Sequence, residues 1–252
     1  MENNKYPYIL KETGDYAVVY KPPKMHSRDK SSGNREQKTE DKLDAALLDW
    51  YAGNSPPVFD IMHRLDYETH GLVLFAKNEK SYLFFKSLQD KGGFVKEYSA
   101  VVIKDSSGTD TMTGFPEYND QTGSRETPFV IESYFRPYGP GRKLVRPVVG
   151  IPKKHKETAK DKGGFYKTEI INMDGNAITA QIRRGFRHQI RCHLCWIGLP
   201  ILNDPIYPAP PDVLPVDILA LRAHALFFTD PADGEYREYR IPPLHSCSEQ
   251  RC

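Results

Sequence analysis

The chain has 252 residues, of which 39% are hydrophobic and 12% aromatic, and this is enough to bury one substantial core. Its formal net charge is only +2, so overall charge alone does not indicate a nucleic-acid partner. It contains no apolar run of about 18 residues, and residues 1–11 lack an apolar signal segment. We therefore expect a soluble, cytoplasmic, monomeric protein with no membrane partner. We expect residues 1–252 to form one domain, with its core over 16–231 and a flexible tail over 245–252.

The first part of the chain alternates between strand and helix signals. The apolar run over residues 16–20 predicts a strand that ends at a pair of prolines. Residues 27–42 are polar and charged and predict a mobile loop. Apolar residues at helical spacing then predict a helix over 41–51, with Asp41 as its cap. The next expected elements are strands over 72–76 and 94–103 and, between them, a helix over 79–89.

The second part of the chain carries weaker signals. Residues 105–127 are polar and glycine-rich and predict a long connection. Two strands, over 165–173 and 177–182, are expected to form a hairpin because Asp174-Gly175 lies between them. The remaining expected elements are a helix over 192–198, a turn-rich loop over 199–208, and a helix turn or strand over 219–228. Together these elements predict one sheet with helices packed on it.

Positive charge is concentrated in two segments. The first contains Arg142, Lys143, Arg146, Lys153, Lys154, Lys156, Lys160, Lys162 and Lys167, against Glu157 and Asp161 only. The second contains Arg183, Arg184, Arg187 and Arg191 and no acid. A single basic run is most simply a solvated loop. Two such runs in one small protein favour a phosphate-rich ligand.

The cysteines and histidines were considered as metal ligands. Cys192 and Cys195 form a Cys-x-x-Cys pair, but Cys247 and Cys252 do not complete a zinc-binding spacing. We expect the first pair to be buried core residues, and we expect no structural metal and no disulfide. A metal-dependent hydrolase remains a rival hypothesis, and its ligands would come from His63, His188, His193 and Asp204. None of these has the spacing of a recognised metal motif.

The most informative segment is His63-Arg64-Leu65-Asp66-Tyr67-Glu68-Thr69-His70-Gly71, which runs directly into four large apolar residues. This pattern places Asp66 on a polar loop that a buried strand holds rigidly. Reactive carboxylates are commonly mounted in this way. Asp66 is therefore the leading candidate for a catalytic acid or nucleophile.

Several separated segments resemble the RluA-type pseudouridine synthases. The matching segments are Lys21-Pro22-Pro23, His63 to Ala76, Lys96-Glu97-Tyr98, His188-Gln189-Ile190-Arg191, Pro200 to Asp204, and Leu221 to Ala225. The resemblance covers residues from about 18 to 231. His70 departs from the pattern, because the family usually has serine there, and so do Phe186 and Arg187, where arginine and threonine are usual.

The resemblance implies an α+β fold, a mixed and largely antiparallel sheet with flanking helices and long loops. It implies that the chain isomerises uridine to pseudouridine in ribosomal or transfer RNA without a cofactor. Asp66 would be the catalytic residue, as either nucleophile or base. Arg191 would form an ion pair with Asp66, and Tyr98 would lie against the uracil and help remove the C5 proton.

The resemblance also implies how RNA is held. Arg64 would fill the space left by the flipped nucleotide, although a salt bridge to a local acid is an equally good reading. The other expected RNA-binding residues are Lys96, Arg142, Lys143, Arg146, Arg187, His188 and Gln189. Residues 1–16 are too few for the S4-like domain of many relatives, so we expect none. The alternative function is a catalytically silent RNA-binding protein of the same fold.

Overall fold

The computed structural model describes residues 5–28, 46–103, 114–118, 126–150, 165–207 and 218–245. Most of the expected loop over 27–42, the cap Asp41, most of the 105–127 connection, Cys247, Cys252 and nearly all of the tail over 245–252 lie outside these ranges. The chain divides into two compact units, one of residues 1–96 and 222–242, the other of residues 97–221 and 243–252. The single domain over residues 1–252 stays a prediction.

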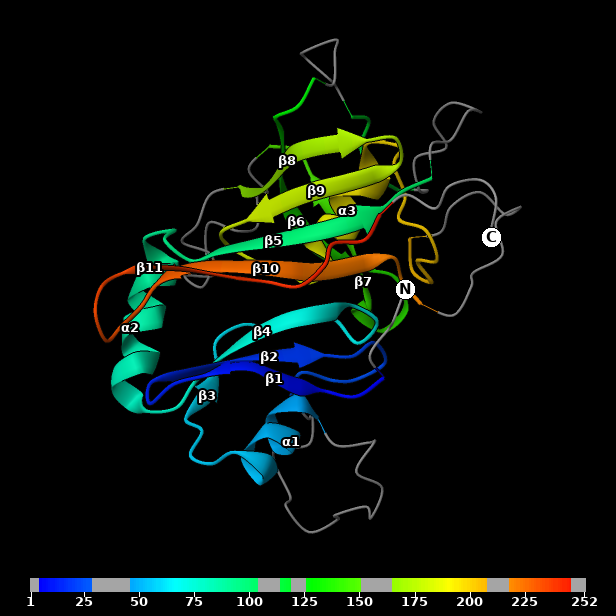
Figure 1. The fold of residues 1–252 in the computed structure, drawn as a ribbon. Helices are drawn as coiled ribbons and strands as arrows, with labels where there is room; N and C mark the ends of the chain where they lie inside the picture. Colours follow the sequence, from blue (N-terminus) through cyan, green and yellow to red (C-terminus); the bar gives the residue numbers. More distant parts are fainter. Residues whose placement is uncertain are drawn as a thin grey trace. The chain divides into compact units, whose positions relative to one another are not determined.

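The first unit is built on six strands (Figure 1). These are β1 (Tyr8–Glu12), β2 (Tyr16–Lys21), β3 (Asp60–Ile61), β4 (His70–Ala76), β10 (Leu221–Thr229) and β11 (Tyr236–Arg240). Strands β1, β2, β4 and β10 follow one another in the sheet, and off this path β11 pairs with β10 and β3 pairs with β4. All pairs are antiparallel except β4 with β10, which is parallel. Both β2 and β4 are buried along their whole length, because helices or strands cover both of their faces.

Two helices belong to this unit, α1 (Leu47–Asn54) and α2 (Glu79–Asp90). Asn78 caps α2 through a reciprocal pair of bonds with Ser81, so the predicted helix begins where expected. Phe85 of α2 packs edge-on against Tyr16 and Phe228 in the core. The predicted helix over 41–51 is confirmed from Leu47 onward, but it continues to Asn54.

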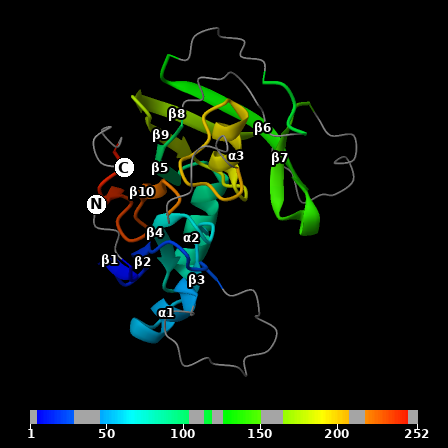
Figure 2. The ribbon, with the colours of Figure 1, turned by 90° about the vertical axis from the view of Figure 1, so that its right-hand side faces the viewer.

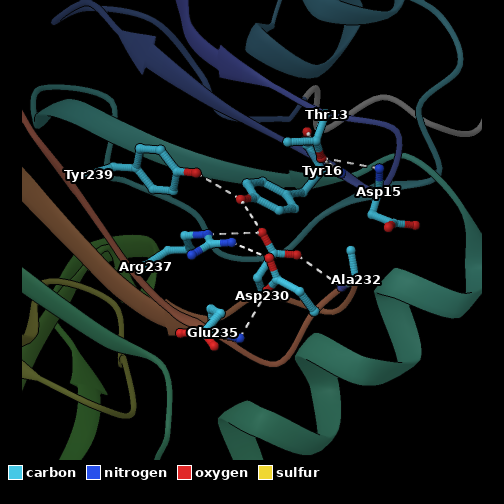
Figure 3. Close-up of polar contacts among 9 residues, drawn as sticks. Thr13, Asp15, Tyr16, Asp230, Ala232, Glu235, Arg237 and Tyr239 are labelled. Carbon is cyan, nitrogen blue, oxygen red and sulfur yellow. Dashed lines mark hydrogen bonds and ion pairs between the residues drawn. The ribbon is translucent and has the colours of Figure 1, made fainter.

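Buried polar contacts fasten the β10–β11 hairpin to β2 (Figure 3). The Tyr16 hydroxyl donates to Asp230 Oδ2 at 2.9 Å and lies 2.7 Å from the Tyr239 hydroxyl. Asp230 also accepts from Arg237 Nε at 3.3 Å and from the Ala232 backbone N–H at 2.9 Å. Burial raises the pKa of Tyr16, so the hydroxyl keeps its proton and remains a donor.

The second unit contains antiparallel strands with one helix packed on them. Its strands are β5 (Val95–Val101, which begins in the first unit), β6 (Phe129–Tyr138), β7 (Leu144–Val148), β8 (Tyr166–Asp174) and β9 (Ala177–Ile182). Their order is β5-β9-β8-β6-β7. The hairpin of β8 and β9 is confirmed, with Gly175 at φ +58° in its turn, a conformation that favours glycine.

Helix α3 (Gln189–Trp196) packs against β6, β7 and β8 (Figure 2). His193 is central to this contact, since its Nδ1 lies 2.8 Å from the Thr168 hydroxyl and its Nε2 lies 2.9 Å from the Ser133 hydroxyl. Cys192 and Cys195 are buried free thiols, as expected for core residues, and burial raises the pKa of Cys195 to about 12. The mixed, mostly antiparallel α+β fold is therefore as predicted.

Several elements differ from expectation. Strands β6 and β7 and the short helix η1 (Pro140–Arg142) lie in a segment for which no regular structure was predicted. The edge strands β1 and β11 were also missed, because their partly exposed residues carry a weak apolar pattern. Residues 221–229 form a strand and not a helix turn.

Candidate active site

Asp66 lies on the loop between β3 and β4, and its side chain is half-buried. The Thr69 backbone N–H donates to the Asp66 carbonyl at 3.2 Å, which turns the chain toward β4. Arg64 and Tyr67, on the same loop, are exposed. The structure thus places a carboxylate, an arginine and an aromatic ring on one short loop.

Ser27 holds the loop from its N-terminal side. The Leu65 backbone N–H donates to Ser27 Oγ at 3.0 Å, and Ser27 Oγ donates to the Leu65 carbonyl at 2.9 Å. Both backbone polar groups of Leu65 are therefore satisfied by one buried hydroxyl. This bridge fixes the residue directly before Asp66.

Lys21 holds the loop from its other side. Its ammonium is buried and donates to the carbonyls of Pro22 at 2.9 Å, Met25 at 2.7 Å and Tyr67 at 3.3 Å. Burial lowers the pKa of Lys21 to about 7, although the nearby carboxylates of Asp66 and Glu68 oppose the fall. Lys21 therefore puts positive charge near Asp66 and joins the Lys-Pro segment to the acid-bearing loop.

His63 and His70 anchor the two ends of the loop on buried strands. His63 Nε2 accepts from the Leu74 backbone N–H at 3.2 Å, and burial lowers the pKa of His63 well below its ordinary value. His70 Nε2 accepts from Arg222 Nε at 3.0 Å, and burial lowers the pKa of His70 to about 3. Both rings are therefore neutral and act as acceptors.

Gly71 fixes how closely β4 approaches β10. It has φ +124°, and a Cβ atom there would lie 2.2 Å from the Ala223 carbonyl oxygen. No larger residue fits this close backbone contact. The sequence motif thus needs glycine at position 71 for a packing reason.

Arg191, in the second unit, is almost completely buried in a two-point ion pair with Asp204. Its Nε and Nη2 donate to Asp204 Oδ2 and Oδ1 at 2.8 and 2.6 Å. Asp204 Oδ1 also accepts from the backbone N–H groups of Ile206 and Tyr207, at 2.8 and 3.0 Å. Asp204 thus holds the guanidinium in place, a role that the sequence motif did not reveal. The pairing of Arg191 with Asp66 stays a prediction.

Tyr98 is buried in β5, with 6% of its surface exposed. Lys96 lies two residues earlier on the same strand, in the first unit, and is buried as well. Its ammonium lies 4.8 Å from the centre of the Phe94 ring, and burial lowers its pKa to about 8. Lys96 is therefore an interior residue and not part of an exposed basic patch.

Lys153, Lys154, Lys156, Lys160 and Lys162 lie outside the described residues. The structure brings Arg142, of the first basic segment, next to Arg187, of the second. Arg187 is exposed and donates to the carbonyls of Arg142 at 2.6 Å and Leu144 at 3.3 Å. Arg142 and Lys143 are exposed at the turn between β6 and β7. Arg146 lies over the Tyr138 ring at 5.9 Å and donates to the Gly114 carbonyl. These four cations form a basic surface patch.

His188 and Gln189 begin α3. His188 has left-handed backbone angles, and its Nδ1 lies 3.3 Å from the Tyr207 hydroxyl. Gln189 is buried, accepts from the Phe186 N–H, and donates to the Lys167 carbonyl and the Thr168 hydroxyl. Its amide is hydrogen-bonded inside the protein, and its contact with RNA stays a prediction.

Metal binding was a rival hypothesis. Among the described residues, no group of three histidine, cysteine, aspartate or glutamate side chains is arranged to hold a metal ion. His193 is committed to Ser133 and Thr168, and Asp204 to Arg191. The polar groups proposed as ligands thus have other partners.

The fold of both units and the motif-bearing loop define a pseudouridylate synthase fold. Two human structures share it: RNA Pseudouridylate Synthase Domain Containing 1 has a TM-score of 0.63 at 17% identity, and covers 94% of this chain and 84% of its own. RNA Pseudouridylate Synthase Domain Containing 4 has a TM-score of 0.57 at 16% identity, with 94% and 88% covered. At this identity the likeness shows the fold alone.

The sequence shows the family directly. The family model described as RNA pseudouridylate synthase matches residues 15–196, so the chain belongs to this family of isomerases. It is 26% identical to the uncharacterized RNA pseudouridine synthase MG209 of Mycoplasma genitalium, over 94% of this chain and 68% of that protein. It is 26% identical to the uncharacterized RNA pseudouridine synthase YlyB of Bacillus subtilis, over 72% and 51%. The chain thus matches 68% and 51% of the length of these two relatives.

Proposed function

We propose that this chain converts uridine to pseudouridine in RNA and that Asp66 is its catalytic carboxylate. Membership of the family supports the reaction. The observation that carries the assignment to Asp66 is its loop: Asp66 is half-buried, and the residues on either side of it are held, Leu65 by Ser27 and Tyr67 by the buried ammonium of Lys21. Such fixed positioning is what a group that attacks or deprotonates a sugar requires.

The reaction is an isomerisation and balances without a co-reactant. The bond from uracil N1 to ribose C1′ breaks, the base turns, and a bond from C5 to C1′ forms. The proton on C5 leaves to solvent, and N1 gains one. Asp66 acts either as the nucleophile at C1′ or as a base at the ribose, and both roles need it ionised.

Lys21 places a positive charge near Asp66. It carries positive charge below about pH 7, and its ammonium is tied by three carbonyls so that it cannot move away. Arg64 is exposed on the same loop and is available to take the place of a flipped nucleotide. The roles proposed for Tyr98 and Arg191 rest on the resemblance of their motifs.

RNA would be bound partly by the basic patch of Arg142, Lys143, Arg146 and Arg187. Phosphate contacts of this kind release counterions, so we expect binding to weaken steeply with salt. One relative, from Buchnera aphidicola, is named ribosomal large subunit pseudouridine synthase D, at 24% identity. Ribosomal RNA is therefore one candidate substrate, and transfer RNA is the other.

The location and assembly of the protein are also proposals. Among the described residues, no helix is long and apolar enough to cross a membrane. We propose a cytoplasmic monomer. Sedimentation of the purified protein tests the monomer, and a second species of twice the mass would contradict it.

The decisive test is release of tritium from RNA labelled at C5 of uridine, with a chelator present. Wild-type protein should release it, and Asp66→Asn should abolish release while the protein stays folded and binds RNA. Asp90→Asn, an exposed aspartate at the end of α2, is the matched control and should be as active as wild type. Retained turnover in Asp66→Asn would overturn the assignment. No release by wild type would favour the two alternatives, the silent RNA-binding protein or the metal-dependent hydrolase, since neither removes the C5 hydrogen.

The substrate can be found independently. Mapping pseudouridines in total RNA before and after addition of the protein should show new sites in ribosomal or transfer RNA.

Tyr98→Phe should slow release of tritium by about a hundredfold or more if the hydroxyl helps remove the C5 proton. Unchanged release in Tyr98→Phe would remove that role.

A further inference from the structure

Two aromatic rings lie together at the surface of the acid-bearing loop. Tyr67 directly follows Asp66, and the centre of its ring lies 4.7 Å from that of His26, at an interplanar angle of 43°. Tyr67 is 43% exposed, and His26 is exposed as well. Both residues belong to the first unit. The hydrogen bonds that hold the loop use neither ring, so they do not explain why the two rings lie together here.

One buried ammonium ties the backbone of both segments that carry these rings. Lys21 Nζ donates to the Tyr67 carbonyl at 3.3 Å. It also donates to the carbonyl of Met25, the residue before His26, at 2.7 Å. Because Lys21 is fully buried, this tether lies inside the protein, away from solvent. The two segments are therefore held next to each other from within.

Ser27 ties the same two segments a second time. It directly follows His26, and its hydroxyl exchanges two hydrogen bonds with the backbone of Leu65, at 3.0 and 2.9 Å. The His26 carbonyl in turn accepts from the backbone N–H of Leu47, at the start of α1, at 2.8 Å. Surface loops are usually more mobile than the elements they connect. The backbone below this ring pair is instead fixed at several points.

A fixed pair of exposed rings suits a ligand with a flat face. A tyrosine ring offers a large contact area, and only two side-chain rotations are lost when it binds. Here the tethered backbone and the contact with His26 already hold the ring, so binding would cost little further conformational entropy. The flat groups of RNA are its bases, and every base has a face that can stack on an aromatic ring.

The place of Tyr67 in the chain indicates which base it meets. Consecutive Cα atoms are about 3.8 Å apart, so Tyr67 is one short step from the proposed catalytic carboxylate of Asp66. A uridine that reacts at Asp66 has to leave its stack, and each of its two neighbours then has an uncovered face. Arg64 precedes Asp66 and Tyr67 follows it, and both are exposed. The loop thus carries one exposed flat side chain on each side of the acid.

We propose that the ring pair of His26 and Tyr67 binds one base that flanks the target uridine. The base stacks on the Tyr67 ring, and His26 supports that ring. The inference rests on the proposed function, because it takes RNA as the ligand and Asp66 as the place of the target. The flanking base has to be unpaired, since bases within a helix are stacked on each other. The enzyme therefore recognises a second nucleotide, in a loop, a bulge or a single strand.

The first experiment measures binding to a fluorescein-labelled single-stranded oligouridylate by anisotropy. Tyr67→Ala should raise Kd by about fivefold or more, the lower end of what one base stacked on an aromatic ring contributes. Tyr67→Phe, which keeps the ring, should recover most of this loss. Tyr236→Ala removes a 64% exposed ring from β11 and is the matched control, which should leave Kd unchanged. Equal Kd values for Tyr67→Ala and wild type, or no binding by wild type, would overturn the proposal.

The salt dependence of Kd separates stacking from a contact with phosphate. Stacking on a neutral ring releases no counterions. The slope of log Kd against log salt should therefore be the same in Tyr67→Ala and wild type, although the Kd values differ. A shallower slope in Tyr67→Ala would show that the variant has lost phosphate contacts, and it would contradict stacking as the cause.

A double-mutant cycle tests the role of His26. His26→Ala should raise Kd by less than Tyr67→Ala does, because it leaves the stacking ring in place. The double variant should have the Kd of Tyr67→Ala, because His26 acts only through Tyr67. Additive increases would show that His26 contacts RNA by itself and would contradict its supporting role. Urea unfolding of the same variants checks that each protein is folded in the binding assay.

Turnover separates this inference from the proposed function. With total RNA labelled at C5 of uridine, Tyr67→Ala should release tritium more slowly at low RNA concentration, and KM should rise by a larger factor than kcat falls. The control Tyr236→Ala should match wild type. No release by wild type would defeat the proposed function. Release by wild type with identical concentration dependence in Tyr67→Ala would defeat the inference about the ring pair alone.

Discussion

The buried ion pair of Arg191 and Asp204 makes a strong prediction for Asp204→Asn. The aspartate accepts four hydrogen bonds, two from the guanidinium and two from the backbone N–H groups of Ile206 and Tyr207. The amide oxygen can keep the three bonds to Oδ1. The amide nitrogen, in the place of Oδ2, would then face Arg191 Nε, and two donors would oppose each other.

The expected loss follows from burial. The Arg191 and Asp204 side chains are 1% and 0% exposed, so water cannot replace the lost carboxylate charge. Breaking a buried pair by removing one partner costs about 3–5 kcal/mol. In a protein of this size, 1 kcal/mol shifts Tm by about 2–4 °C, so Tm should fall by about 6–20 °C.

Urea unfolding and thermal circular dichroism measure this loss. Glu238→Gln is the control, since it neutralises a carboxylate that pairs with Arg240 on the surface, and it should cost at most about 1 kcal/mol. Where Asp204→Asn is folded, tritium release should also fall, because Arg191 is no longer held. A loss below about 1 kcal/mol in Asp204→Asn would refute the view that the pair is closed to water.

Three further predictions concern the first unit. Tyr16→Phe should lower the free energy of unfolding in urea by about 1.5–3 kcal/mol, because it removes a donor to a buried carboxylate. A loss no greater than that of the exposed control Tyr236→Phe would contradict this. Gly71→Ala should lower the free energy of unfolding by about 2–6 kcal/mol, the sum of backbone strain and the clash with Ala223. The control Gly175→Ala also has a left-handed backbone but has open space around it, so it should cost less, and equal costs would argue against the clash. Burial lowers the pKa of Lys21 from 10.5 to about 7 in the folded protein. Between these pH values the unfolded chain binds more protons than the folded one, so the free energy of unfolding should rise from about pH 7 to 10.5. Lys21→Met should flatten that rise, and an unchanged slope in the variant would assign it elsewhere.

The sequence predicted best where local chemistry alone decides the backbone. The β8–β9 hairpin follows from Asp174-Gly175, because a tight turn needs positive φ, and α2 follows from the helical spacing of its apolar residues. The strand after Asp66 follows from its apolar run. These features depend on neighbours within a few residues.

Elements that depend on distant partners were missed or misplaced. β1 and β11 are edge strands with partly exposed residues, and they form because β2 and β10 offer unpaired backbone groups. The apolar run of β10 fits a helix or a strand equally well, and only its place between other strands decides the choice. The helix predicted over 192–198 begins three residues earlier, at Gln189, and ends at Trp196.

The features of the candidate site also divide into those set by neighbouring residues and those set by distant ones. Residue types and their order were sufficient to single out Asp66 and the family to which the chain belongs, because the chemistry of the motif is carried by adjacent residues. Only the tertiary structure showed that Ser27 and Lys21 hold the acid-bearing loop, and that Asp204 takes the guanidinium of Arg191. It also buried Gln189 and placed the exposed Tyr67 ring against His26. Burial and partnership are set by packing between distant segments, and no local pattern encodes them.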